Sequence, residues 1–203
     1  MIELNLEPNT NVMKTVNFRY EGININGIEV RFLQIRDYSD DNNIGKILEK
    51  FRKLKETRIE PLKYKQITEK IKYANTDING LNPSHIIALK SHHQEITNLI
   101  NMLNYNVISQ NDIYPEDISD CFLKISEKSI TEYDKVTDDF LREYILNKRL
   151  TENRYLERLL IIDDVIKKGR VINQLLIRLA RNGNFDNNSK IFIFTIYSFK
   201  IIV

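Results

Sequence analysis

The dipeptide Asn26-Gly27, with alternating apolar residues on both sides, is the feature that most constrains the fold of this 203-residue chain. A type I′ turn needs positive φ at both central residues, and Asn-Gly adopts that conformation with little strain. We therefore predict a β-hairpin with its turn at Asn26-Gly27, which places Ile25 opposite Ile28 and Ile23 opposite Val30.

The apolar parity changes at Glu21-Gly22, where we predict a β-bulge because glycine supplies a permissive backbone. Two strands alone are marginal in water, so the hairpin needs a partner. The segment 191–203 is apolar, aromatic and β-branched, which predicts a buried strand. Placed beside the hairpin, it would complete a three-stranded sheet. The alternative is that it docks into another subunit.

Between residues 41 and 183 the apolar spacing is that of helices. The most regular seam begins at Asn82-Pro83-Ser84 and contains Ile86, Leu89, His93, Ile96, Ile100 and Leu103. Further helices are predicted over 44–57, after Pro61, after Pro115, around 136–144, and from Thr151 to Ala180 with a kink or a break at Gly169. The predicted fold class is α+β and mostly helical, with the N-terminal β-hairpin packed on a bundle of five or six helices.

This pattern predicts a single domain with three regions. They are the N-terminal β-hairpin region (1–40), the helical bundle (41–183) and the apolar C-terminal strand (184–203).

The composition gives expectations about compartment and origin. Cys121 is the only cysteine, which excludes an intramolecular disulfide and a cysteine-rich zinc site. The N-terminal segment lacks the pattern of a secretory signal, and no apolar run approaches the roughly 20 residues of a membrane-spanning helix. We expect a cytoplasmic protein, in a bacterial or host cell. Abundant Ile, Asn and Lys favour an AT-rich genome, such as that of a virus, phage or low-GC bacterium.

No catalytic, cofactor or metal site is predicted. The histidines His85, His92 and His93 lie near Glu95, but without the spacing of a helical zinc site, and His93 is interpreted as a packing residue. Cys121 is interpreted as a small buried hydrophobe. The sequence contains neither a G-x-G-x-x-G nor a P-loop motif.

Carboxylate doublets occur at Glu116-Asp117, Asp138-Asp139 and Asp163-Asp164. Adjacent residues on a helix point about 100° apart, so we interpret these doublets as solvated faces. Asp163-Asp164 is the hardest to explain in this way because apolar residues flank it.

The net charge of +2 conceals a segregation of charge along the sequence. A basic stretch carries the candidate nucleic-acid-binding residues, namely Lys46, Lys50, Arg52, Lys53, Lys55, Arg58, Lys63, Lys65, Lys70 and Lys72. The competing interpretation is a solvated helix face in a genome that favours lysine codons.

The apolar seams and the apolar C-terminal segment favour a non-enzymatic protein–protein interaction or assembly protein that self-associates and needs no cofactor. The alternative is a nucleic-acid-binding accessory protein that uses the basic 46–72 region. Enzymatic activity is left open, because an active site can assemble from scattered residues.

Overall fold

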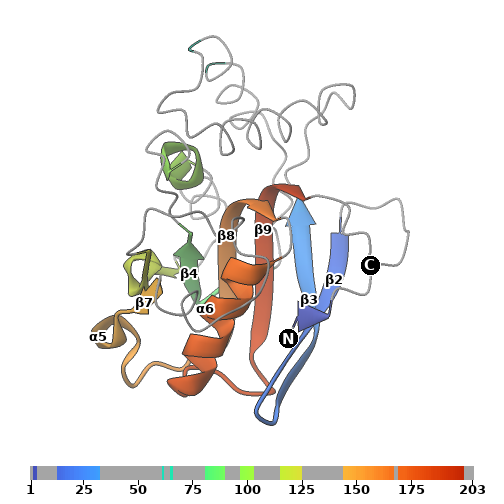
Figure 1. The fold of residues 1–203 in the computed structure, drawn as a ribbon, viewed down its shortest axis with the longest axis vertical. Coiled ribbons are helices and arrows are strands. Elements are labelled where there is room, and N and C mark those ends of the chain that lie inside the picture. The colour runs from blue at the N-terminus through green and yellow to red at the C-terminus, as the bar shows by residue number, and fades with distance from the viewer. Residues whose placement is uncertain are drawn as a thin grey trace.

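The computed structural model describes residues 2–3, 13–32, 61, 65, 81–89, 97–102, 115–124, 144–166 and 169–198. Within them, seven strands form one mixed sheet in the order β1-β2-β3-β9-β8-β4-β5 (Figure 1). The strands are β1 (Ile2–Glu3), β2 (Met13–Tyr20), β3 (Ile23–Phe32), β4 (His85–Ala88), β5 (Glu116–Asp117), β8 (Arg158–Ile166) and β9 (Lys190–Ser198).

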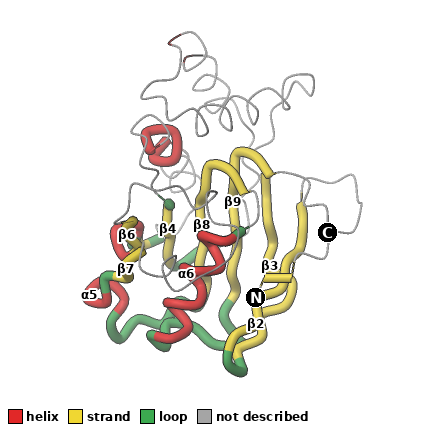
Figure 2. The backbone as a smooth tube through the Cα atoms, in the orientation of Figure 1, coloured by secondary structure: helices red, strands yellow, loops and turns green. Residues whose placement is uncertain are grey.

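A separate antiparallel ribbon pairs β6 (Phe122–Lys124) with β7 (Tyr144–Leu146). The helical elements are α5 (Lys148–Thr151), α6 (Arg170–Arg181), the short 3-10 helix η1 (Ser119–Cys121) and residues 97–102. Figure 2 shows how strands dominate the described part of the chain.

The predicted bundle of five or six helices is therefore wrong. The seam that begins after Asn82-Pro83-Ser84 opens with strand β4, and the helix predicted from Thr151 to Ala180 divides into β8 and α6. Short apolar runs that are buried on both faces have no clear period, so spacing alone does not separate a buried strand from a helix. Strands β4, β8 and β9 of the parallel part of the sheet are formed by such apolar runs.

The hairpin exists, but its turn and its bulge are exchanged relative to the prediction. The turn lies at Glu21-Gly22, where φ is +45° and +88°, as a type I′ turn requires. Asn26 is not among the described residues with positive φ, so Asn26-Gly27 does not form that turn. It lies inside β3 instead.

The strand register follows from this exchange. Phe18 pairs with Ile25 and Val16 with Ile28, and an irregularity separates the two pairs. The predicted pairings of Ile25 with Ile28 and of Ile23 with Val30 are therefore wrong. A bulge at Asn26-Gly27 lets Phe18, Ile25 and Ile28 all reach the core, where each is at most 5% exposed.

Strand β9 lies beside the hairpin, but in a larger sheet than predicted. It pairs in parallel with β3 on one side and with β8 on the other. The apolar C-terminal segment thus contributes an interior strand, which explains its continuous apolar sequence. The three-stranded sheet is replaced by one in which β3, β9, β8, β4 and β5 all run in the same direction.

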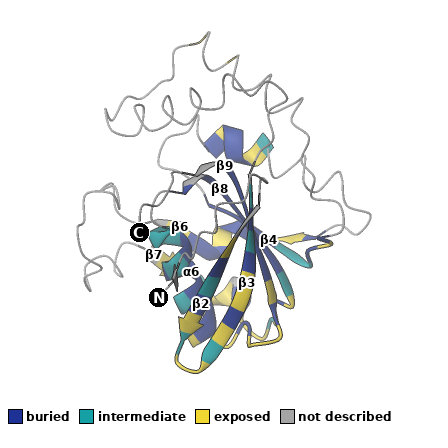
Figure 3. Ribbon diagram, turned by 90° about the vertical axis from the view of Figure 1, so that its right-hand side faces the viewer, coloured by how far each residue is buried: buried dark blue, intermediate teal, exposed yellow. Residues whose placement is uncertain are grey.

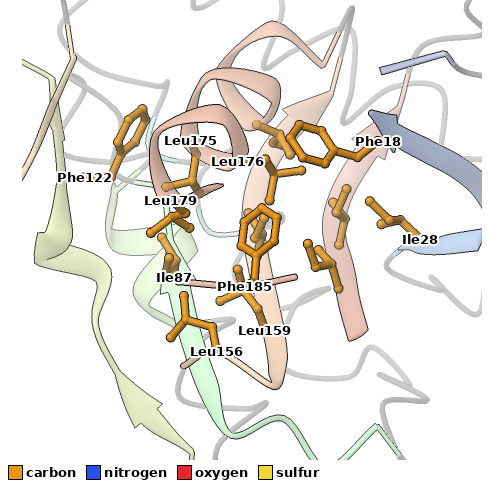
Figure 4. Packing of buried hydrophobic residues seen from close by; sticks show 14 of the residues in the cluster. Phe18, Ile28, Ile87, Phe122, Leu156, Leu159, Leu175, Leu176, Leu179 and Phe185 are labelled. Atoms are coloured by element: carbon orange, nitrogen blue, oxygen red, sulfur yellow. The ribbon is translucent and has the colours of Figure 1, made fainter. Parts of the chain in front are cut away.

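One face of this sheet is covered by α6, which crosses β8 and β9 (Figure 1). The helix buries Ile172, Leu175, Leu176 and Leu179, each at most 1% exposed. They belong to one core cluster with Phe18 of β2 and Leu159 of β8 (Figure 4). Phe18 also meets Phe185 edge-on, with ring centroids 5.8 Å apart.

The opposite face is buried as well in the middle of the sheet, at β8, whereas β2 and β3 also carry exposed residues (Figure 3). Successive side chains of a strand point to opposite faces, and Leu160 and Ile162 are as fully buried as Leu159 and Ile161. The middle of the sheet is therefore a two-sided core. Among the described residues, no helix is long and apolar enough to cross a membrane.

Candidate functional site at the carboxyl edge of β4 and β8

The carboxyl ends of the parallel strands β3, β9, β8 and β4 lie at the same edge of the sheet, which we call the carboxyl edge. The next described strand after β4 along the chain is β5, which lies on the side of β4 away from β8. The next strand after β8, reached through α6, is β9, which lies on the side of β8 away from β4. The next described strands therefore lie on opposite sides of the β8–β4 pair. Open α/β sheets bind ligands outside the strand ends at such a topological switch point.

The pair Asp163-Asp164 lies at this switch point. β4 pairs with β8 as far as Ala88 opposite Ile162, and the Leu89 N–H then donates to the Ile162 carbonyl oxygen at 2.8 Å. The next two residues of β8 are Asp163 and Asp164. β4 therefore stops pairing with β8 where the acidic residues begin, while β9 continues beside them as far as Ser198.

Both aspartates are buried, with 9% of Asp163 and 1% of Asp164 exposed. They follow the apolar run Leu159–Ile162, so an apolar pair would continue the core without the cost of desolvating carboxylates. Buried carboxylates are found where hydrogen bonds, opposite charges or metal ions compensate that cost. The local sequence therefore points to a requirement other than packing.

Hydrogen bonds hold the backbone of this pair. The Asp164 N–H donates to Asp163 Oδ1 at 2.9 Å. Thr195 of β9, opposite Asp163 in the register, donates its hydroxyl to the Asp164 carbonyl oxygen at 3.1 Å. Because successive side chains of a strand point to opposite faces, the two carboxylates do not converge; Asp163, the more exposed of the two, presents the oxygen ligands that Mg²⁺ prefers.

A metal ion held by protein side chains alone does not fit the described residues. Among them, no group of three or more His, Cys, Asp or Glu side chains is placed to hold one. Mg²⁺ often uses only one or two carboxylates, together with waters and the phosphate oxygens of a ligand. The Asp163 carboxylate could serve as the protein ligand of a cation that is shared with a bound phosphate.

A second polar group lies at the opposite, amino edge of the sheet. Glu116 of β5 forms an ion pair with Arg154, and its other oxygen is 3.8 Å from Nε2 of His85. Ser84 Oγ lies 2.9 Å from His85 Nδ1 and also donates to the Arg158 carbonyl oxygen. These contacts connect β5, β4 and β8, so we assign the group a structural role.

The other residues considered from the sequence have varied places. Cys121 is buried, and burial raises its pKa to about 12, which makes it a poor nucleophile. Of the basic residues, Lys65 is helical and exposed, and the other nine lie outside the described residues. His92, His93, Glu95 and Asp138-Asp139 also lie outside them.

The sequence pointed to Asp163-Asp164 but supplied the wrong geometry. On a strand the two carboxylates point to opposite faces, so they diverge even more than on a helix, although both lie at the carboxyl end of β8. The available signal was a short apolar, β-branched run that ends in two acids. No protein-family model matches the chain, and no curated protein sequence matches it significantly.

Proposed function

We propose that this domain binds a phosphate-bearing ligand, such as a nucleotide, together with a divalent cation at the carboxyl edge of β8. Asp163 would supply an oxygen ligand to the cation. The observation that carries the proposal is the position of this buried acidic pair, at the residues where β4 leaves β8 and beside a topological switch point.

The proposal is limited to binding. Nucleotide hydrolysis in parallel-sheet proteins commonly uses a glycine-rich P-loop whose lysine contacts the phosphates. The chain has no G-x-x-x-x-G-K-[ST] sequence, so the proposal does not extend to phosphate transfer.

Two titrations test the proposal. Electron paramagnetic resonance of free Mn²⁺ measures cation binding, and calorimetry with ATP, with Mg²⁺ or with EDTA, measures phosphate-ligand binding. We expect the unaltered protein to bind Mn²⁺, and to bind ATP more tightly when Mg²⁺ is present. Asp163→Asn, which keeps the side-chain shape, should lower Mn²⁺ affinity at least about tenfold and more than Asp164→Asn does.

Glu157→Gln is the matched control, because Glu157 is an exposed carboxylate just before the other end of β8. It should leave both titrations unchanged. Absence of Mn²⁺ and ATP binding by the unaltered protein would contradict the proposal, as would an equal loss in Glu157→Gln. Asp163 is the more exposed of the pair, so Asp163→Asn is informative even if the Asp164 variant unfolds.

The two functions predicted from sequence remain separate proposals. Self-association was motivated by an apolar tail that belongs, up to Ser198, to the interior strand β9, so that motivation is weaker. Nucleic-acid binding by the basic 46–72 region stays a prediction, to be tested by salt-dependent titration with DNA and RNA. The cytoplasmic location predicted from the sequence also stays a proposal.

A further inference from the structure

We propose that Asn26-Gly27 is a site of spontaneous covalent modification, by deamidation, and that Asn17 restrains the reaction. The reaction needs only water, and it is independent of the ligand proposed above. An Asn-Gly pair offers it little steric hindrance, because glycine has no side chain beside its backbone nitrogen. The two Asn-Gly pairs in the described part of the chain, Asn26-Gly27 and Asn182-Gly183, differ in how the fold holds them.

The reaction consumes the side-chain amide of Asn26. The Gly27 backbone nitrogen loses its proton to solvent and attacks Cγ of Asn26, and the new C–N bond closes a succinimide ring as ammonia leaves with a proton taken from solvent. Water then adds to a ring carbonyl carbon and breaks its bond to the ring nitrogen, which gives aspartate or isoaspartate. Isoaspartate carries the main chain through Cβ, so it lengthens β3 ahead of Glu29–Phe32, the residues that pair with β9.

The first support is the accessibility of the pair. Asn26 and Gly27 are both exposed, although Ile25 and Ile28 on either side of them are buried in the core. Water therefore reaches both reacting groups in the folded protein. Gly27 also has φ of +74° at the bulge, where the regular ladder between β2 and β3 is interrupted.

The second support is the restraint on the attacking nitrogen. The Gly27 N–H donates to Oδ1 of Asn17 at 2.9 Å. This bond stabilises the protonated nitrogen and holds it toward β2, so it opposes both the loss of the proton and the approach to Cγ of Asn26. A bond to an exposed side chain opens more readily than the bonds inside a sheet. The rate at Asn26 therefore depends on one bond that a substitution can remove.

Asn182-Gly183 is an internal reference, because the fold holds both of its reacting groups. The Asn182 side-chain amide donates to Thr151 Oγ1 at 3.1 Å and to Asn184 Oδ1 at 2.8 Å. The Gly183 N–H donates to a carbonyl oxygen of the last turn of α6 at 2.9 Å. Global unfolding frees both Asn-Gly pairs, whereas loss of the Asn17 bond frees only Asn26-Gly27.

Peptide mass spectrometry of protein held in mildly alkaline buffer measures the conversion of each asparagine, since trypsin places the two pairs in separate peptides. We expect Asn26 of the unaltered protein to react more slowly when folded than in urea. Asn17→Ala should accelerate the reaction at Asn26 about fivefold, the factor equivalent to one hydrogen bond, and leave Asn182 unchanged. Asn17→Asp keeps an acceptor oxygen and should restore the slow rate. Gly22→Ala, which strains the hairpin turn but keeps the Asn17 bond, is the control for lost stability.

A rate at Asn26 that is no higher in Asn17→Ala than in Gly22→Ala would overturn the inference, and so would equal rates in the folded and the unfolded unaltered protein. If Asn17→Ala unfolds, Asn182 accelerates together with Asn26. Amide hydrogen exchange of Gly27 in the unaltered protein then decides: exchange slower than in the unfolded chain supports the restraint, and exchange as fast as in the unfolded chain overturns it.

Discussion

The side-chain oxygen Oδ1 of Asn17 accepts a hydrogen bond from the backbone N–H of Gly27 at 2.9 Å, across the irregularity between β2 and β3. Gly27 has φ of +74°, a conformation that glycine adopts readily. The bond gives a partner to an N–H at the bulge, where the regular ladder is interrupted. Asn17 and Gly27 therefore stabilise the bulge together.

Asn17→Ala should destabilise the hairpin, because the Gly27 N–H loses its side-chain partner. The expected loss in the free energy of unfolding is about 1 kcal/mol, the usual contribution of one hydrogen bond. Urea denaturation followed by circular dichroism measures it. Arg19→Ala, on the exposed side of β2, is the control. An Asn17 variant as stable as Arg19→Ala would contradict this role.

The position of the turn gives a second prediction. Gly22→Ala should destabilise the protein by about 1–2 kcal/mol, because an L side chain at φ of +88° is strained. Asn26→Ala should be close to neutral, since Asn26 is exposed and is not in a positive-φ conformation. If the hairpin turned at Asn26-Gly27 instead, Asn26→Ala would be destabilising, because Asn26 would then have positive φ. Paired urea midpoints of the two variants distinguish the arrangements.

This exchange shows what the local sequence determined. Both Glu21-Gly22 and Asn26-Gly27 were recognised as irregular positions, because glycine and a change of parity mark them. Asn-Gly is the stronger turn signal in isolation. The outcome depends on the core instead, since the bulge at Asn26-Gly27 lets Phe18, Ile25 and Ile28 lie buried together. The hairpin therefore adopts the arrangement that buries these apolar side chains, not the one that the local Asn-Gly sequence favours.

Strand β8 shows the same limit at the candidate site. Leu159, Ile162 and Ile166 have helical spacing, yet Leu159–Ile162 are all fully buried. A strand between β9 and β4 has no solvent-facing side, so the alternation that marks an ordinary strand is missing. The helical part of the same prediction agrees with α6, whose buried residues do recur with a helical period. The position of Asp163-Asp164 depends on strand pairing between distant segments, which no local pattern contains.

The single thiol gives a third prediction. Cys121 is buried and its pKa is raised to about 12 by burial first and by the charge of Asp120 second. At pH 8 almost no thiolate is present, so native protein should react negligibly with a disulfide reagent or iodoacetamide. Denaturation should release one reactive thiol per chain. Rapid, complete modification without loss of structure would contradict the assigned packing.

His85 gives a prediction about pH. Burial is the largest cause that lowers the pKa of His85 below 6.5; Glu116 opposes the shift and Arg154 adds to it. The unfolded chain therefore takes up its proton at a higher pH than the folded protein does. Stability is unaffected by His85 above pH 6.5 and is lost as pH falls from 6.5 through the lower folded pKa.

NMR titration of the histidine ring protons measures this pKa directly, and His85→Gln assigns the signal among the three histidines. We expect a midpoint below 6.5 for His85. Urea midpoints between pH 7.5 and 5.5 should fall more steeply for the unaltered protein than for His85→Gln. The comparison stays above the range in which Glu116 and Asp186 titrate, because the pKa of each is lowered, by Arg154 and by Tyr155 respectively. A midpoint above 6.5 would mean that Glu116 outweighs burial, and the loss of stability would then disappear.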